Sequence, residues 1–177
     1  MIMSPRVRRL ALSIHLTCSV GWIGAVLAYL GLGISAVNTS NAATVRSAWT
    51  AMELIGWYVL VPLAVLSLLS GVVMALGTKW GLFRYYWVAF AFVLTTLATL
   101  VLILHMPSIS AVADAVQTAS PADLDRYGGD LFHASLALVL LLAIQVLNLY
   151  KPPGMTRYGW RRRRTGRSQY PTAPLTR

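Results

Sequence analysis

The chain has 177 residues, of which 57% are hydrophobic and only 11% are charged, and its formal net charge is +10. Soluble domains usually carry about a quarter of charged residues, so this composition excludes an ordinary soluble domain and favours an integral membrane protein. A basic net charge can also indicate nucleic-acid binding, but the basic residues here flank apolar segments. We therefore expect the lipid bilayer, and not nucleic acid, as the partner.

Four apolar segments in chain order are long enough to cross a bilayer, which takes about 20 residues. They are residues 10–36, 52–76, 86–106 and 131–150, and none contains Lys or Arg. Because backbone groups in lipid must be paired within the segment, we predict an all-α, antiparallel four-helix transmembrane bundle over residues 1–151. The first segment is too long for the core of a signal peptide, and we interpret it as a retained helix.

The distribution of charge predicts the orientation of this bundle. Thirteen of the fifteen Lys and Arg residues fall before the first segment, between the second and third, or after the fourth, whereas all five acidic residues fall on the other side. The positive-inside rule then predicts that both termini are cytoplasmic. We expect residues 152–177 to form a basic, partly disordered cytoplasmic tail that contacts anionic lipid headgroups. Another membrane protein is the alternative partner.

Smaller features refine the expected bundle. Pro62 predicts a kink in the second helix, and a small-residue face that includes Gly24 predicts close packing of the first helix. On that basis we expect Gly24→Leu to overfill a helix interface. Residues 107–130 are expected to form an outer loop with a short helix beginning near Ser120 and Pro121.

Two histidines are the main candidates for chemistry on the outer side. His105 ends the third segment and His133 begins the fourth, so antiparallel helices bring them to the same depth. Glu53, Met106, Met52 and Asp130 belong to the same layer. Of these we take Glu53 and Met106 as further candidate metal ligands, because imidazole, thioether and carboxylate together suit copper or another transition metal. Two imidazoles could instead hold a haem b iron, serve a proton-coupled role, or bind nothing at the membrane interface.

His15 is a separate candidate, because it lies near the opposite side of the membrane. Ser19 and Trp22 follow at helical spacing on the same face, and Tyr29 continues this seam. One interpretation is a hydrogen-bonded histidine in a helix interface. The other is a ligand or proton site, which would be independent of His105 and His133.

Two stretches, residues 77–87 and 150–159, resemble segments of small uncharacterised integral membrane proteins common in actinobacteria. With the first helix, the resemblance covers most of residues 10–160 and implies the four-helix topology, but no activity. Such proteins often have a lysine in the third helix, where this chain has Ala91. More distantly, His15, Trp22 and Gly24 are similar to the first-helix pattern of the copper-resistance D membrane domain, which implies a metal role for His15 alone.

These observations lead to a hypothesis for function. The chain is expected to be a non-enzymatic multi-pass protein of the bacterial plasma membrane, with an accessory or structural role. The alternative is a haem- or copper-binding membrane protein in redox or metal handling. A small transporter is less favoured, because no charged residue lies at the middle of the predicted spans.

Overall fold

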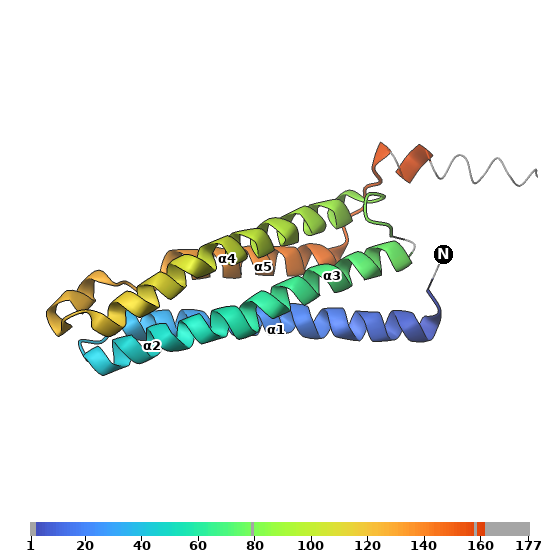
Figure 1. Cartoon of the computed structure of the whole chain (residues 1–177). Coiled ribbons are helices and arrows are strands. Elements are labelled where there is room, and N and C mark those ends of the chain that lie inside the picture. The colour runs from blue at the N-terminus through green and yellow to red at the C-terminus, as the bar shows by residue number, and fades with distance from the viewer. Residues whose placement is uncertain (1–2, 79, 158, 162–177) are drawn as a thin grey trace, which may run out of the picture.

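The chain folds into a long bundle of helices. The computed structural model describes residues 3–78, 80–157 and 159–161 (Figure 1). The elements are α1 (Pro5–Val37), α2 (Ala42–Ile55), a π-helical turn (Gly56–Leu60), α3 (Val61–Gly77), α4 (Tyr86–Thr118), a 3-10 turn (Pro121–Arg126) and α5 (Leu131–Tyr150). Within these residues there is no strand, only an isolated bridge between Tyr85 and Met155.

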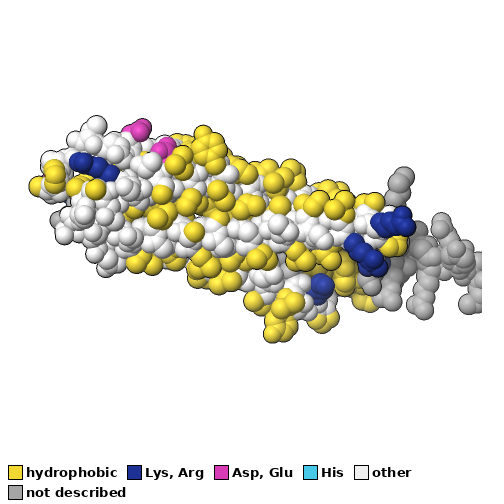
Figure 2. Space-filling view, turned by 90° about the horizontal axis from the view of Figure 1, so that it is seen from below, with side chains coloured by type: hydrophobic (Ala, Val, Ile, Leu, Met, Phe, Trp, Pro, Cys, Tyr) yellow, Lys and Arg dark blue, Asp and Glu magenta, His cyan; other side chains and the backbone are white. Residues whose placement is uncertain are grey.

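Four helical stretches are long and apolar enough to cross a membrane: α1, the continuous stretch Ala42–Gly77, α4 and α5. Hydrophobic side chains cover the length of the bundle, and charged side chains gather towards its two ends (Figure 2). Such a surface would be unfavourable in water but suits lipid. The predicted all-α architecture with four spans is therefore confirmed.

The four spans form a closed ring in which each span packs against two others, with α2 and α3 counted as one span. Helix α1 packs against α2 and α3 on one side and against α5 on the other, and α4 completes the ring by packing against α2, α3 and α5. We call the end with residues 38–41 and 119–130 the distal end. The opposite end, with residues 3–4, 80–85 and 151–161, is the terminal end, because both described chain ends lie there (Figure 1).

The predicted helix bounds match α5 and the start of α4, and they lie within one residue of the ends of α1 and α3. The other three bounds differ from the structure. Helix α1 begins at Pro5, the second span begins at Ala42 and not at residue 52, and α4 continues to Thr118 and not to residue 106. A helix of 33 residues is about 50 Å long, whereas the hydrocarbon core is about 30 Å thick. Apolar composition thus marks the part of a helix that suits lipid, and the helix itself runs on past it.

Polar contacts hold the distal extensions of α2 and α4 together. The Arg46 guanidinium donates to the carbonyl oxygens of Val116 at 3.2 Å and Ala119 at 2.8 Å, which are acceptors left free at the end of α4. Trp57 Nε1 also donates to Ser110 Oγ at 3.0 Å. Residues 107–118 were expected to be a loop, but they form a helix because α2 supplies these partners and the helix accommodates a proline.

The distortion expected near Pro62 is found just before it, as the π-helical turn Gly56–Leu60. Proline lacks the N–H that would continue the α-helical ladder, and π turns commonly absorb such irregularities. Gly56 in this turn lies directly against the side chain of Met106, which is fully buried. A Cβ at Gly56 would collide with the thioether end of Met106, so that side chain occupies the space that the glycine leaves beside α4.

The expectation that Gly24 lies in a helix interface is wrong. A Cβ added to Gly24 would meet no atom within 4 Å, whereas one on Gly33 would lie 2.7 Å from the Gly129 carbonyl oxygen. The buried residues of α1 include Trp22, Val26 and Gly33, and Gly24 points away from that stripe. Small residues alone could not show which face of α1 meets protein, because lipid and protein both accept an apolar face.

The beginning of the predicted tail packs on the loop between α3 and α4. Thr156 donates through its N–H to the Arg84 carbonyl oxygen at 3.0 Å and through its hydroxyl to that of Phe83 at 2.6 Å. Tyr86 donates in turn to the Gly154 carbonyl oxygen. Residues 162–177, with most of the arginine run, lie outside the described residues. The two stretches 77–87 and 150–159 therefore contact each other in the fold.

Candidate metal centre at the distal end

Asp130 is the centre of a polar cluster that joins three helices. Its carboxylate accepts hydrogen bonds from Tyr29 Oη at 3.0 Å and His105 Nε2 at 3.1 Å, both on Oδ2, and from His133 Nδ1 at 2.7 Å on Oδ1. These partners come from α1, α4 and α5 respectively. The Asp130 side chain is only 9% exposed. A carboxylate this buried requires such partners, because an unpaired buried charge is costly.

Close backbone packing places Asp130 against α1. Gly33 and Gly129 touch through their backbones, and a Cβ on either residue would collide with the other. Tyr29 precedes Gly33 by one helical turn, so the same face of α1 presents its hydroxyl to the residue that follows Gly129. The two glycines therefore set the position of the carboxylate relative to the Tyr29 hydroxyl.

The backbone of Asp130 is also unusual. Its φ is +25°, in the left-handed region that non-glycine residues rarely adopt. It occupies the N-cap position of α5, where an aspartate normally accepts from the first backbone N–H groups, yet its side chain makes no capping bond. The carboxylate is thus turned away from its ordinary structural role and towards the two imidazoles. Unfavourable backbone conformations of this kind are concentrated at functional sites.

The two imidazoles lie against each other, and this confirms the expected proximity of His105 and His133. Their ring centroids are 4.1 Å apart with an interplanar angle of 33°. The His105 side chain is 23% exposed and that of His133 is 50% exposed. One side of the cluster is therefore open to the surface, whereas the carboxylate is at its buried side.

Three potential metal ligands converge at this point. One ligand atom from each of His105, Asp130 and His133 lies within 4.8 Å of the other two. Two imidazole nitrogens and one carboxylate oxygen are a common donor set for Zn²⁺, Cu²⁺ and non-haem Fe²⁺. In a tetrahedral site with bonds of about 2.0–2.2 Å, ligand atoms are roughly 3.4 Å apart, so small side-chain rotations would bring these three into range. Both imidazoles already direct a nitrogen towards the carboxylate.

The same geometry does not suit a haem held by both histidines. Two axial imidazoles must lie on opposite faces of the porphyrin, with the ring of the haem between them. Here the imidazoles are stacked directly on each other, and both direct a nitrogen to Asp130. They leave no gap for a porphyrin, so the cluster fits a single metal ion better than haem b.

The other predicted ligands lie outside this cluster. Glu53 is half-buried on α2 and is not among the clustered ligand atoms of the described residues. Met106 is fully buried, and its sulfur would lie 2.6 Å from a Cβ at Gly56, on the side of the π turn. His15 lies towards the terminal end and bonds to Ser70 Oγ at 3.0 Å. Asp130 thus takes the carboxylate position that the sequence suggested for Glu53.

Two members of the cluster were missed as candidate site residues. Asp130 was recognised only as part of the same layer, and Tyr29 only as part of the His15 seam. The spacing of Asp130 and His133, three residues apart at a helix start, was a usable signal, because that spacing brings side chains to one face. No sequence signal pointed to Tyr29, since its contact with Asp130 spans 101 residues.

An apolar cavity of about 200 Å³ extends from the cluster between α4 and α5. Besides Tyr29 and the three clustered residues, its lining is almost entirely hydrophobic. Leu97 and Val101 on α4 and Leu136 on α5 line the cavity and are also exposed, at 51%, 57% and 56%. The buried side of the cluster can therefore be reached from the lipid-facing surface.

Comparison with known proteins identifies no relative. The chain matches no protein-family model, no curated protein and no solved structure. The resemblance to small actinobacterial membrane proteins and to the copper-resistance D membrane domain therefore stays a prediction.

Proposed function

We propose that this protein is a metal-binding multi-pass protein of the bacterial plasma membrane. In this proposal His105, Asp130 and His133 bind one divalent transition-metal ion at the distal end, and Tyr29 holds the carboxylate in place. The observation that carries the proposal is the convergence of three ligand atoms within 4.8 Å around a carboxylate that does not cap its own helix. The protein would then carry or sense the ion, with no catalytic role assigned to the cluster.

The orientation in this proposal follows from charge. Arg6, Arg8, Arg9, Arg84 and Lys151 all lie at the terminal end, whereas Asp123 and Asp130 lie at the distal end. The positive-inside rule favours a cytoplasmic terminal end, and the metal site would then face the outside. The basic residues that follow α5 would contact anionic lipid headgroups of the inner leaflet.

The donor set favours Cu²⁺ or Zn²⁺ over Cu⁺. Imidazole nitrogen and carboxylate oxygen suit the divalent ions, whereas Cu⁺ prefers thiolate and thioether sulfur. The sulfur of Met106 packs against Gly56. The only cysteine, Cys18, is buried on α1 and lies about three helical turns before Tyr29, roughly 16 Å away along the helix. The three clustered ligands of the described residues are thus nitrogen and oxygen donors.

A structural role is the second candidate, and one observation favours it. The Asp130 carboxylate joins α1, α4 and α5 through three hydrogen bonds. Such a network could fix the distal end of an accessory or structural membrane protein. The metal-binding role and the structural role differ in one testable property. In a metal site an ion displaces the protons on the ligand atoms, whereas in a purely structural network those protons stay in place.

Metal binding should be tested on protein purified with a non-histidine affinity tag. Isothermal titration with Zn²⁺ and Cu²⁺ should give one site per chain, proton release on binding, and weaker binding in acid, because ligands must lose protons to bind metal. His105→Ala and His133→Ala should each abolish this site. Glu53→Gln and His15→Ala, which change groups outside the cluster, should leave it intact. Absence of a stoichiometric site in the wild-type protein would favour the structural role.

Orientation is tested separately by reporter fusion. A reporter after Arg177 should read as cytoplasmic, and one inserted at Ser120, in the exposed distal connection, should read as external. A reversed result would place the metal cluster on the cytoplasmic side without affecting its ability to bind an ion.

A further inference from the structure

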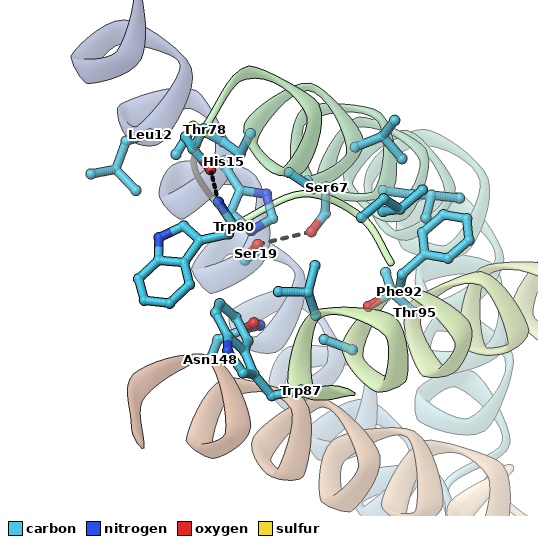
Figure 3. A pocket seen from close by; sticks show the side chains of 18 of the residues that line it. Leu12, His15, Ser19, Ser67, Thr78, Trp80, Trp87, Phe92, Thr95 and Asn148 are labelled. Carbon is cyan, nitrogen blue, oxygen red and sulfur yellow. Dashed lines mark hydrogen bonds between the residues drawn. The ribbon is translucent and has the colours of Figure 1, made fainter. Parts of the chain in front are cut away.

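A second cavity lies at the terminal end, far along the bundle from the metal cluster. It has a volume of about 330 Å³ and lies among α1, α3, α4 and α5 and the loop before α4 (Figure 3). This volume is within the range of small-molecule binding sites, about 300–1,000 Å³. Leu12 and Leu16 on α1 and Leu149 on α5 line the cavity and are 42%, 46% and 74% exposed. The cavity can therefore be entered from lipid between α1 and α5.

Several hydrogen-bonding groups in the cavity wall are not used by the protein. Trp87 is 8% exposed, and its buried Nε1–H has no hydrogen-bond partner. Among the described residues, the side-chain amides of Gln145 and Asn148 and the hydroxyl of Thr95 also make no hydrogen bond, although all three are half-buried in the same wall. Unpaired polar groups in a lipid-embedded bundle are costly, so this wall is suited to a ligand that accepts hydrogen bonds.

The opposite wall presents an acceptor. Ser70 Oγ lies 2.6 Å from the Leu66 carbonyl oxygen and therefore donates its only hydrogen there. His15 Nδ1, 3.0 Å from the same Ser70 Oγ, must then be the donor in that contact. A backbone hydrogen bond to Ser67 also restrains the His15 ring. In the tautomer with the proton on Nδ1, a neutral His15 has a lone pair on Nε2. The nearby Ser19 and Ser67 hydroxyls bond to each other at 2.8 Å, which uses one of their two hydrogens.

The chemistry of the lining restricts the ligand. Among the described residues that line the cavity, only Lys151 is charged. It is exposed, and its Nζ lies 5.9 Å from the centroid of the Trp80 ring. The remaining surface is mostly aliphatic, with the aromatic rings of Trp80, Trp87 and Phe92 around it (Figure 3). An uncharged, flat and lipid-soluble molecule is favoured over an ion. It should offer oxygen acceptors to the Trp87 side and a hydroxyl donor to His15.

We propose that this cavity binds the headgroup of a membrane quinol. A quinol has hydroxyl groups at opposite edges of an aromatic ring, and each hydroxyl can both donate and accept. One hydroxyl would donate to His15 Nε2, and the other would accept from Trp87 Nε1–H and the Gln145 amide. The isoprenoid chain would leave between Leu16 and Leu149 into the bilayer. The oxidised quinone has carbonyl groups only, so it keeps the Trp87 contact and loses the donor to His15.

The test uses the full-length protein in nanodiscs of pure phosphatidylcholine, with decylubiquinol kept anaerobic and decylubiquinone as probes. Isothermal titration against empty nanodiscs should show saturable binding, tighter for the quinol. Trp87→Phe keeps the aromatic side chain but removes the Nε1–H donor. It should weaken the affinity for both probes about fivefold to tenfold, which is the effect of one lost hydrogen bond. His15→Leu should remove the preference for the quinol over the quinone.

Trp49→Phe is the matched control, because Trp49 also has a buried Nε1 without a partner but does not line this cavity. It should bind both probes as the wild type does. Melting temperatures of all variants show whether they fold. The proposal fails if wild-type protein binds no better than empty nanodiscs, or if Trp87→Phe binds as tightly as wild type. It also fails if phenyldecane competes equally well, since the cavity would then accept any apolar chain.

Discussion

The Asp130 cluster at the distal end and the cavity at the terminal end differ in how their buried polar groups are paired. At the distal end, the Asp130 carboxylate gathers Tyr29, His105 and His133 into one closed hydrogen-bonded cluster. At the terminal end, Trp87 Nε1 is buried without a partner beside a cavity of about 330 Å³. The role of a buried polar group in a membrane protein is therefore indicated by the groups to which it hydrogen-bonds. A closed cluster joins helices and, under the proposed function, would offer its ligand atoms together to an ion, whereas unpaired groups around a cavity favour a separate ligand.

The largest effect should come from removing the centre of the distal cluster. Asp130→Ala leaves three donors without their acceptor, and we expect a loss of about 3 kcal/mol in the free energy of unfolding together with loss of the proposed metal site. Thermal unfolding in detergent and metal titration measure the two effects. Asp114→Ala, at an exposed position on α4, is the control and should change neither. An unchanged melting temperature for Asp130→Ala would show that the cluster does not support the fold.

A smaller loss is expected when the backbone contact that positions Asp130 is disturbed. Gly129→Ala places a Cβ against the Gly33 backbone, and overpacking of this kind costs about 1–3 kcal/mol. Gly128→Ala is a closely matched control, because a Cβ there would meet nothing within 4 Å. Differential scanning fluorimetry should separate the two variants. Equal melting temperatures would show that the distal loop can move away from α1 without cost.

Removing one hydrogen-bond donor from the cluster should lower the free energy of unfolding by less than either Asp130→Ala or Gly129→Ala. Tyr29→Phe deletes the hydroxyl that donates to Asp130 at 3.0 Å but keeps the buried ring, so we expect a loss of about 1 kcal/mol. The proposed metal site should persist, because its three ligands remain. Tyr58→Phe, at a side chain that is 76% exposed, should have no effect on stability. Complete loss of metal binding in Tyr29→Phe would make Tyr29 a ligand and not a positioning residue.

The smallest effect is expected at the terminal end. Ser19 and Ser67 share one hydrogen bond of 2.8 Å between α1 and α3, and such contacts in membrane proteins are worth about 0.6 kcal/mol. A double-mutant cycle of Ser19→Ala and Ser67→Ala should measure a coupling near that value. A coupling as large as the effect of Asp130→Ala would mean that the terminal end is held by its polar groups as firmly as the distal end.

The mispredicted helix ends show where apolar composition stops being informative. Residues 107–118 contain Asp114, Gln117 and several serine and alanine residues, which do not mark a membrane span. They are helical because the Arg46 side chain of α2 donates hydrogen bonds to carbonyl oxygens that the end of α4 leaves unpaired. These partners are about 70 residues away in sequence, and no local pattern predicts them.

The sequence by itself determined the class of fold and the depth of the two histidines. Long apolar segments without basic residues must be helices in lipid, and antiparallel neighbours must bring His105 and His133 to one level. The tertiary structure decided which carboxylate joins them. His133 follows Asp130 by three residues, but helix packing brings His105 on α4 and Tyr29 on α1 to the same carboxylate. It also decided which face of α1 is buried and which polar groups remain unpaired beside the terminal cavity. Helix rotation and backbone contact set these features, and hydropathy carries no information on either.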